Sequence, residues 1–326
     1  MSSEGIYPAP YAPPVNGGAR KWRALRALQR RRHYWVHGLL FLLTFLTTTV
    51  VGARMAQDFA ADRPLFAGAG ELALLQRAVQ EPSLLLAGLP FSATLMMILL
   101  AHELGHLLTC VHYRIDATLP YFLPAPTLIG TLGAFIRIRS PIYSRRVLFD
   151  VGIAGPLAGF LTLLPVLGIG LAFSKVIPGI AARGDIIFST PPLLMLLEGL
   201  VFPGVPTSDI YLHPMARAAW VGLLATALNL IPIGQLDGGH VLYALAADQH
   251  KWLSRLFLLV LVPLGIFFWY GWLLWAALLF FFGMKHPSIV DTTRLDPERR
   301  RLALAGLALF LLSFSLAPIE PRFSLQ

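Results

Sequence analysis

The sequence predicts an all-α polytopic membrane protein with about six to seven transmembrane helices and a short membrane-associated β-element between the second and third spans. Of its 326 residues, 56% are hydrophobic and only 13% are charged, whereas a soluble protein carries about 25% charged residues. Apolar runs long enough to cross a bilayer recur along the chain. Lys and Arg give a net charge of +9 and cluster beside these runs, so the charge indicates membrane orientation and not nucleic-acid binding.

The first part of the chain predicts a tail and two spans. Residues 1–33 are rich in Pro, Gly and Ala and end in a basic run, so we expect a disordered cytoplasmic tail. The first span is expected at about 34–51 and the second at about 84–111. A signal peptide would have shorter flanks and a small-residue cleavage site, so the first span is expected to be retained, with the N-terminus in the cytoplasm.

The remaining apolar runs complete one transmembrane domain, expected over residues 34–318 and followed by a short C-terminal tail, 319–326. Further spans are expected at about 147–173, 215–233, 253–283 and 302–316. Residues 253–283 fit either one long tilted span or a hairpin of two short ones. The interrupted apolar patch at 192–202 is expected to be a surface helix on the outer side.

A His-Glu-Leu-Gly-His segment lies inside the second apolar run, where ionisable groups are costly unless something holds them. On a helix, His102 and His106 project from the same face, at the spacing that holds a zinc ion through two nitrogens. Glu103 lies beside them and can act as general base. The segment predicts one zinc ion per chain. Cys110, the only cysteine, lies on the same face and is either a further ligand or a small buried hydrophobe.

A second polar segment ends the fourth apolar run, with the sequence Asn-Leu-Ile-Pro-Ile-Gly-Gln-Leu-Asp-Gly-Gly-His at 229–240. Asp237 alone would indicate a turn or a helix cap. Beside the His-Glu-Leu-Gly-His segment it indicates the third protein ligand that a catalytic zinc requires. Pro232 is expected to interrupt the helix, and the amide of Asn229 can bind a peptide backbone.

The segment between the second and third spans is expected to be non-helical. Pro120, Pro124 and Pro126 exclude a helix there, and residues 134–139 partly alternate between apolar and polar, as a strand does. A strand with a free edge near a zinc site could pair with an extended peptide. An ordinary basic loop explains the same pattern equally well.

With His-Glu-Leu-Gly-His in one span and Asn-Leu-Ile-Pro-Ile-Gly-Gln-Leu-Asp-Gly-Gly in a later one, the chain resembles the site-2 protease family of intramembrane zinc metalloproteases. Residues 130–141 and 286–291 are similar to those of bacterial and plastid-type members, and no PDZ or CBS domain is recognisable. The resemblance implies that His102, His106 and Asp237 bind zinc and that Glu103 is the catalytic base.

The resemblance also implies how substrate is held. Asn229 and Pro232 would position it, and a β-element would keep it extended through Gly133, Ala134, Phe135 and Ile136. The implied partners are a single-pass transmembrane protein or peptide and the lipid bilayer, with no nucleic acid. We expect an integral protein of a bacterial inner membrane, with the active site inside the membrane towards the cytoplasm.

Three other functions share some of these features. A prenyl-protein-processing membrane metalloprotease also carries the two histidines and the glutamate, but lacks the Leu-Asp-Gly-Gly segment. A catalytically silent membrane chaperone or binding protein would be expected to lose Glu103 or a ligand. A metal transporter would need ionisable groups inside other spans, where this chain has Asp150 only at an edge and Arg255 only at an end. The sequence favours the protease and leaves its substrate, trigger and oligomeric state open.

Overall fold

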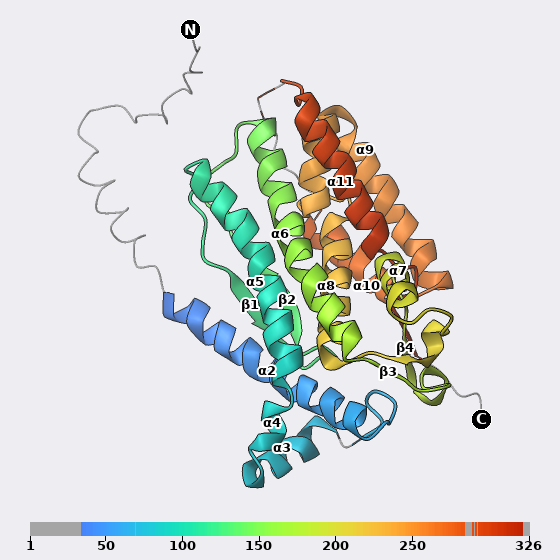
Figure 1. Cartoon of the computed structure of the whole chain (residues 1–326). Helices are drawn as coiled ribbons and strands as arrows, with labels where there is room; N and C mark the ends of the chain where they lie inside the picture. Colours follow the sequence, from blue (N-terminus) through green and yellow to red (C-terminus); the bar gives the residue numbers. More distant parts are fainter. Residues whose placement is uncertain (1–33, 69, 284–288, 290, 292, 322–326) are drawn as a thin grey trace. The chain divides into compact units, whose positions relative to one another are not determined.

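The computed structural model describes residues 34–68, 70–283, 289, 291 and 293–321 (Figure 1). The tail predicted at 1–33 and most of the 286–291 segment therefore lie outside the described residues. The chain divides into a unit of residues 1–36 and a main unit of residues 37–326. Of the first unit only Tyr34–Val36, the start of a helix, is described, and all other described residues belong to the main unit.

Within the described residues, four helices are long and apolar enough to cross a membrane, since a span needs about 20 residues. They are α2 (Tyr34–Ala60), α5 (Leu89–His112), α6 (Arg145–Ala172) and α9 (Asp237–Phe267). The other helices are α3 (Glu71–Gln80), α4 (Ser83–Leu86), α7 (Pro192–Val201), α8 (Pro214–Leu230), α10 (Gly271–Leu278) and α11 (Pro297–Ser313). Short 3-10 turns occupy Ala181–Arg183 and Thr207–Asp209, and a π turn occupies Leu279–Gly283. The predicted helical membrane architecture is confirmed at this level, and the exact number of spans stays a prediction.

In the described part of the chain, three antiparallel strand pairs accompany the helices. They are β1 (Tyr121–Pro124) with β2 (Thr131–Phe135), β3 (Lys175–Val176) with β5 (Ile210–Tyr211), and β4 (Ile186–Phe188) with β6 (Ile319–Pro321). The first pair follows α5 and precedes α6. The last pair joins the start of the expected C-terminal tail to the segment before α7. No local sequence signal indicated this pairing.

The region after the fourth apolar run departs from the sequence-based expectation. A span was expected to start near residue 253, but α9 begins already at Asp237 and runs to Phe267, with non-helical backbone at Ala246. The adjacent α10 begins at Gly271 and packs against α9. Residues 253–283 therefore form a helical hairpin and not one straight helix, because the chain turns at Phe268–Tyr270.

Close helix packing forms the core of the main unit. Helices α5, α6 and α8 pack against one another, and α9 packs against α6 (Figure 1). Gly105 on α5 has no room for a side chain, since a Cβ there would lie 2.5 Å from the backbone oxygen of Ala154 on α6. Small residues at such contacts let two helix backbones approach closely. Trp220, Phe91 and Leu163 fill the core between these helices.

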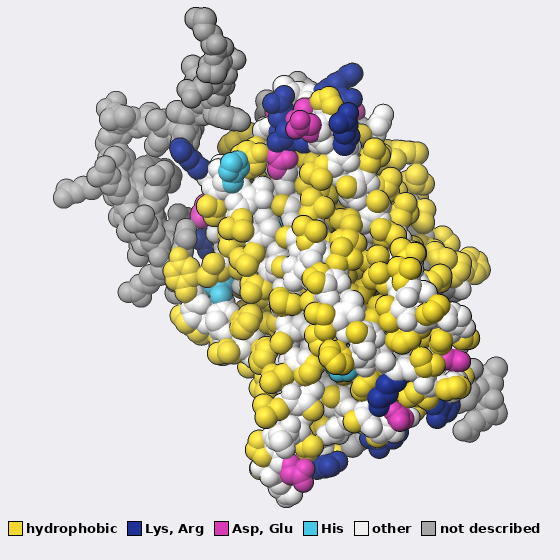
Figure 2. All heavy atoms as spheres, in the orientation of Figure 1, with side chains coloured by type: hydrophobic (Ala, Val, Ile, Leu, Met, Phe, Trp, Pro, Cys, Tyr) yellow, Lys and Arg dark blue, Asp and Glu magenta, His cyan; other side chains and the backbone are white. Residues whose placement is uncertain are grey.

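The outer surface is that of a protein surrounded by lipid. Figure 2 shows hydrophobic side chains over the middle of the visible face, while charged side chains gather towards its two ends. Leu161 on α6 and Phe267 on α9 are 69% and 76% exposed, which is unfavourable in water and favourable in a bilayer. The apolar surface and the helix lengths are both those of an integral membrane protein.

The start of α6 is capped by a distant residue. Oδ2 of Asp291 accepts hydrogen bonds from Ser144 Oγ at 3.0 Å and from the backbone N–H of Arg145 at 3.2 Å, while Oδ1 accepts two from Thr293. Slight burial raises the pKa of Asp291, but the hydrogen bonds from Thr293, Ser144 and Arg145 outweigh it and lower the pKa from 3.8 to about 2. A carboxylate is favourable here because the first turn of a helix has unpaired N–H groups and a positive dipole end.

We expect Asp291→Ala to reduce the free energy of unfolding by about 1 kcal/mol, the usual cost of losing a helix-capping acceptor. Because the folded pKa is lowered, the carboxylate stabilises the fold fully above pH 3.8 and loses this effect as the pH falls towards 2. Thermal unfolding of both proteins in detergent should differ at pH 7 and converge near pH 2. Asp185→Ala, at an exposed position, is the control, and an equal loss in both variants would contradict the capping role.

Candidate metal centre

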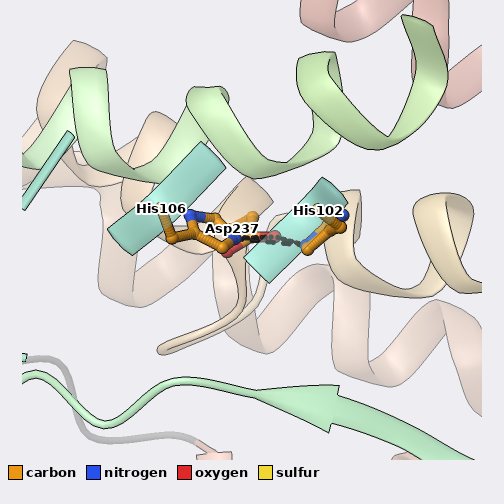
Figure 3. Close-up of side chains that lie close together, drawn as sticks. All are labelled: His102, His106 and Asp237. Atoms are coloured by element: carbon orange, nitrogen blue, oxygen red, sulfur yellow. Dashed lines mark hydrogen bonds and ion pairs between the residues drawn. The ribbon is translucent and has the colours of Figure 1, made fainter. Parts of the chain in front are cut away.

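The two histidines predicted to bind metal lie on one face of α5, and both are buried. Asp237, the first residue of α9, places Oδ2 3.2 Å from Nε2 of His102 and 3.3 Å from Nε2 of His106. The two histidine Nε2 atoms are 3.1 Å apart. Figure 3 shows the three side chains pointing towards one another.

These separations fit a zinc site. Zinc binds histidine nitrogen and carboxylate oxygen at about 2.0–2.2 Å with tetrahedral geometry, so neighbouring ligand atoms should lie about 3.3 Å apart. The three separations between the donor atoms of His102, His106 and Asp237 run from 3.1 to 3.3 Å. A set of two imidazoles and one carboxylate is also one that zinc enzymes use.

The tautomer of His106 supports the same conclusion. Its Nδ1 lies 2.7 Å from the backbone oxygen of Val151 on α6 and therefore donates the proton of the ring in that bond. In the neutral imidazole the lone pair then sits on Nε2, which faces the Asp237 carboxylate. Two acceptors that face each other in a buried site need a proton or a metal ion between them, and this tautomer leaves Nε2 free to bind a metal ion.

Two glycines of α6 make room for the imidazoles. A Cβ on Gly155 would overlap Nε2 of His106, and one on Gly159 would lie 3.2 Å from Cβ of His102. In an apolar run, small residues by themselves indicate only close packing of helices. Their spacing of four matches that of His102 and His106, a signal that could have linked the two helices. Neither Gly155 nor Val151 was among the predicted site residues.

The loop after α8 carries Asp237 into the site. Helix α8 ends at Leu230, three residues before the expected end of the span at 233, because Pro232 interrupts it and the residue before a proline disfavours helical backbone. The chain then returns so tightly that Gly238 lies against the backbone oxygen of Leu230, where a Cβ would not fit. Asn229 lies at the end of α8 with Nδ2 3.3 Å from Nε2 of His102. The structure thus brings Asn229 to the metal ligands themselves.

The β1–β2 hairpin lies beside the same site. Strand β2 packs against α5, and the backbone N–H of Ile136, directly after β2, lies next to the carboxylate of Glu103. Gly133, Ala134 and Phe135 belong to β2. One edge of β2 pairs with β1, and among the described residues no strand pairs with its other edge. Glu103 itself is 4% exposed.

Cys110 takes no part in the metal cluster found among the described residues. Its side chain is completely buried, one turn beyond His106 on α5. Of the two interpretations of this cysteine, the structure therefore favours the small buried hydrophobe.

Comparison with known proteins assigns the family. A sequence profile for peptidase family M50 matches residues 90–270, more than half of the chain. "Probable zinc metalloprotease EGY1, chloroplastic" from Arabidopsis thaliana is 32% identical over 245 residues, 72% of this chain and 43% of the relative. The corresponding EGY2 protein of the same plant is 33% identical over 245 residues, 73% of this chain and 43% of the relative. EGY1 of Oryza sativa subsp. japonica is 33% identical over 164 residues, 48% of this chain and 28% of the relative.

The matched region contains both the α5 histidines and Asp237, and the class that it defines is that of zinc metalloproteases embedded in a membrane. The chain belongs to peptidase family M50, the site-2 protease family. It spans less than half the length of these three relatives.

Proposed function

We propose that the protein is an intramembrane endopeptidase that hydrolyses a peptide bond within or near a transmembrane segment of a membrane protein, as in regulated intramembrane proteolysis. The observation that carries this proposal is that Asp237 of α9 converges on His102 and His106 beside Glu103. These last three residues belong to α5, which is long enough to cross a membrane. A hydrolytic site at that depth acts on a peptide that is itself in the membrane.

The roles of the side chains follow from their chemistry. His102, His106 and Asp237 would hold a single zinc ion. When bound, zinc lowers the pKa of a water molecule and polarises a carbonyl group. Glu103 removes a proton from the attacking water and delivers it to the leaving amine. The backbone oxygen of Val151 keeps His106 in the tautomer whose Nε2 is free to coordinate.

Substrate is proposed to bind as an extended strand. A transmembrane helix must unwind before cleavage, which leaves backbone groups unpaired where water is scarce. The unpaired edge of β2 can receive them by strand addition, with Gly133, Ala134, Phe135 and Ile136 along the edge. Asn229 and Pro232 would help to hold the peptide near Glu103.

The orientation in the membrane is proposed from the charges. Basic residues follow α5 and flank the starts of α6 and α11: Arg114, Arg137, Arg139, Arg145, Arg146, Arg299, Arg300 and Arg301. The positive-inside rule puts this end in the cytoplasm, together with the N-terminus. His102 and His106 lie in the later half of α5, so the active site is displaced towards the cytoplasm. We propose one transmembrane domain over 34–318 with six to seven spans.

The membrane itself is proposed to be a bacterial inner membrane. The relatives carry the word chloroplastic in their names, so a plastid membrane is the alternative. Cell fractionation of the source organism distinguishes the two, because the protein will be recovered with either the plasma membrane or the plastid.

The proposal is tested with purified protein in detergent. We expect about one zinc ion per chain and cleavage of at least one peptide in a panel of loosely helical transmembrane segments. Removal of zinc with a chelator should abolish cleavage, and added zinc should restore it. Zinc binding without cleavage of any peptide would favour a silent chaperone or a transporter, and absence of zinc would refute the metal centre.

A further inference from the structure

A cavity lies away from the metal centre, between α7, the start of α8 and the segments around β4 and β5. Its volume is about 550 Å³, counted out to its open mouth. Arg217 lines this cavity near the start of α8, whereas Asn229 lies at the metal centre near the end of the same helix. Twelve residues of helix separate them by about 18 Å.

Two oppositely charged side chains line the cavity, Glu198 from α7 and Arg217 from α8. Both are buried, with 3% and 8% of their surfaces exposed. Within the described part of the chain, Oε2 of Glu198 and Nε of Arg217 have no hydrogen-bond partner, and no direct ion pair joins the two residues. Buried charged groups are stable only when they are paired and hydrogen-bonded. The cavity therefore contains one negative and one positive side chain that each lack a partner for a polar atom.

Arg217 contacts an aromatic side chain that also lines the cavity. The guanidinium of Arg217 lies over the ring of Phe188, with Cζ 4.8 Å from the ring centroid. The nearby polar groups of Ser189 are already bonded, the backbone oxygen to Trp220 Nε1 and the hydroxyl to Ser315. Among the described residues, these contacts leave Nε of Arg217 without a hydrogen-bond partner.

We propose that this cavity binds a small zwitterion of the amino-acid type, with its carboxylate against Arg217 and its ammonium group against Glu198. A lone anion would pair with Arg217 but be repelled by Glu198, and a lone cation would meet the reverse situation. Only a molecule that carries both charges can pair with both side chains at once. The cavity is small, so glycine and alanine are the first candidates, and Thr190 and Thr207 also line it.

The ionisation of Glu198 is consistent with this binding mode. Burial raises its pKa to about 7, and the positive charge of Arg217 opposes that rise. An ammonium group beside the carboxyl group would favour its charged form. Binding at this cavity is independent of protease activity, since none of these residues belongs to the metal centre.

Binding is tested by calorimetry and thermal unfolding of the full chain in detergent at pH 7, with glycine, L-alanine, acetate and methylammonium as probes. We expect glycine or alanine to bind saturably and to raise the unfolding temperature. Acetate and methylammonium should bind at least about tenfold more weakly, alone or mixed, because each leaves one buried charge unpaired.

Glu198→Gln should weaken binding of the zwitterions by about tenfold or more and reduce their advantage over acetate. Leu196→Ala, on the exposed side of α7, is the matched control and should bind as the wild type does. Unchanged zinc content in both variants checks that they fold. No saturable binding of glycine or alanine to the wild type, or equal binding of acetate, would overturn the proposal; in the first case water fills the cavity and in the second it is an anion site.

Discussion

Glu103→Gln is expected to lower the rate of peptide-bond cleavage by at least about 100-fold and to leave the zinc content unchanged. The amide has the shape of the carboxylate but accepts no proton, so proton transfer from the attacking water is lost. Glu103 is not one of the three converging metal donors, so the ion should stay bound. Cleavage of a model transmembrane peptide and zinc content are measured on the same preparations.

The control for this substitution is Glu81→Gln, which makes the same chemical change at an exposed residue after α3. It should cleave and bind zinc as the wild type does. If Glu103→Gln cleaves at a comparable rate, Glu103 is not the base. If it loses zinc as well as activity, its role is to support the metal site and the assignment of the proton transfer must change.

Gly155→Ala is expected to reduce zinc affinity by about 10- to 100-fold, the range for disturbing the groups that support a metal ligand, and to lower cleavage in parallel. The added Cβ would overlap Nε2 of His106 and lie 2.5 Å from its Cδ2 and Cε1. The ring cannot move away freely, because Nδ1 is bonded to Val151, one turn earlier on α6. Zinc retention during titration with a chelator measures the effect.

Gly168→Ala on the same helix is the matched control, since a Cβ there has no atom within 4 Å. Both substitutions replace glycine by alanine inside a helix, which by itself favours the helix by about 1 kcal/mol. The two positions differ in the contact with His106 and in the residue that follows, since Gly155 precedes Pro156 and an added Cβ before a proline disfavours helical backbone. Equal zinc affinity in the two variants would show that α6 yields to the extra methyl group, and the tight fit of His106 against α6 would then be unimportant for binding.

Much of the candidate site could be read from short-range patterns. The spacing of His102 and His106 puts both rings on one face, because helix geometry is local. Pro232 likewise predicted that α8 ends nearby, because the effect of a proline on helical backbone is local. The third ligand could be inferred only from a chemical requirement, since Asp237 lies 135 residues beyond His102. That requirement does not give the distance between the groups, which depends on how α5 and α9 pack.

The ends of the helices were predicted less accurately. The sequence placed the start of this helix near residue 253, whereas α9 starts at Asp237. The polar residues between these two positions resemble a loop in composition. The turn at Phe268–Tyr270 was visible only as an alternative. Helix ends depend on packing and on caps as well as on propensity, so hydropathy alone locates them poorly.

By itself the sequence determined a helical membrane protein with two histidines, a glutamate and a distant aspartate suited to zinc, because these features depend on composition, helical period and ligand chemistry. Only the tertiary structure decided that Val151 orients His106, that Gly155 leaves room for its ring, and that Ile136 reaches Glu103. It alone decided that Glu198 and Arg217 share a cavity. Such contacts join residues far apart in the chain, and they arise from the way helices pack against one another, which no local pattern encodes.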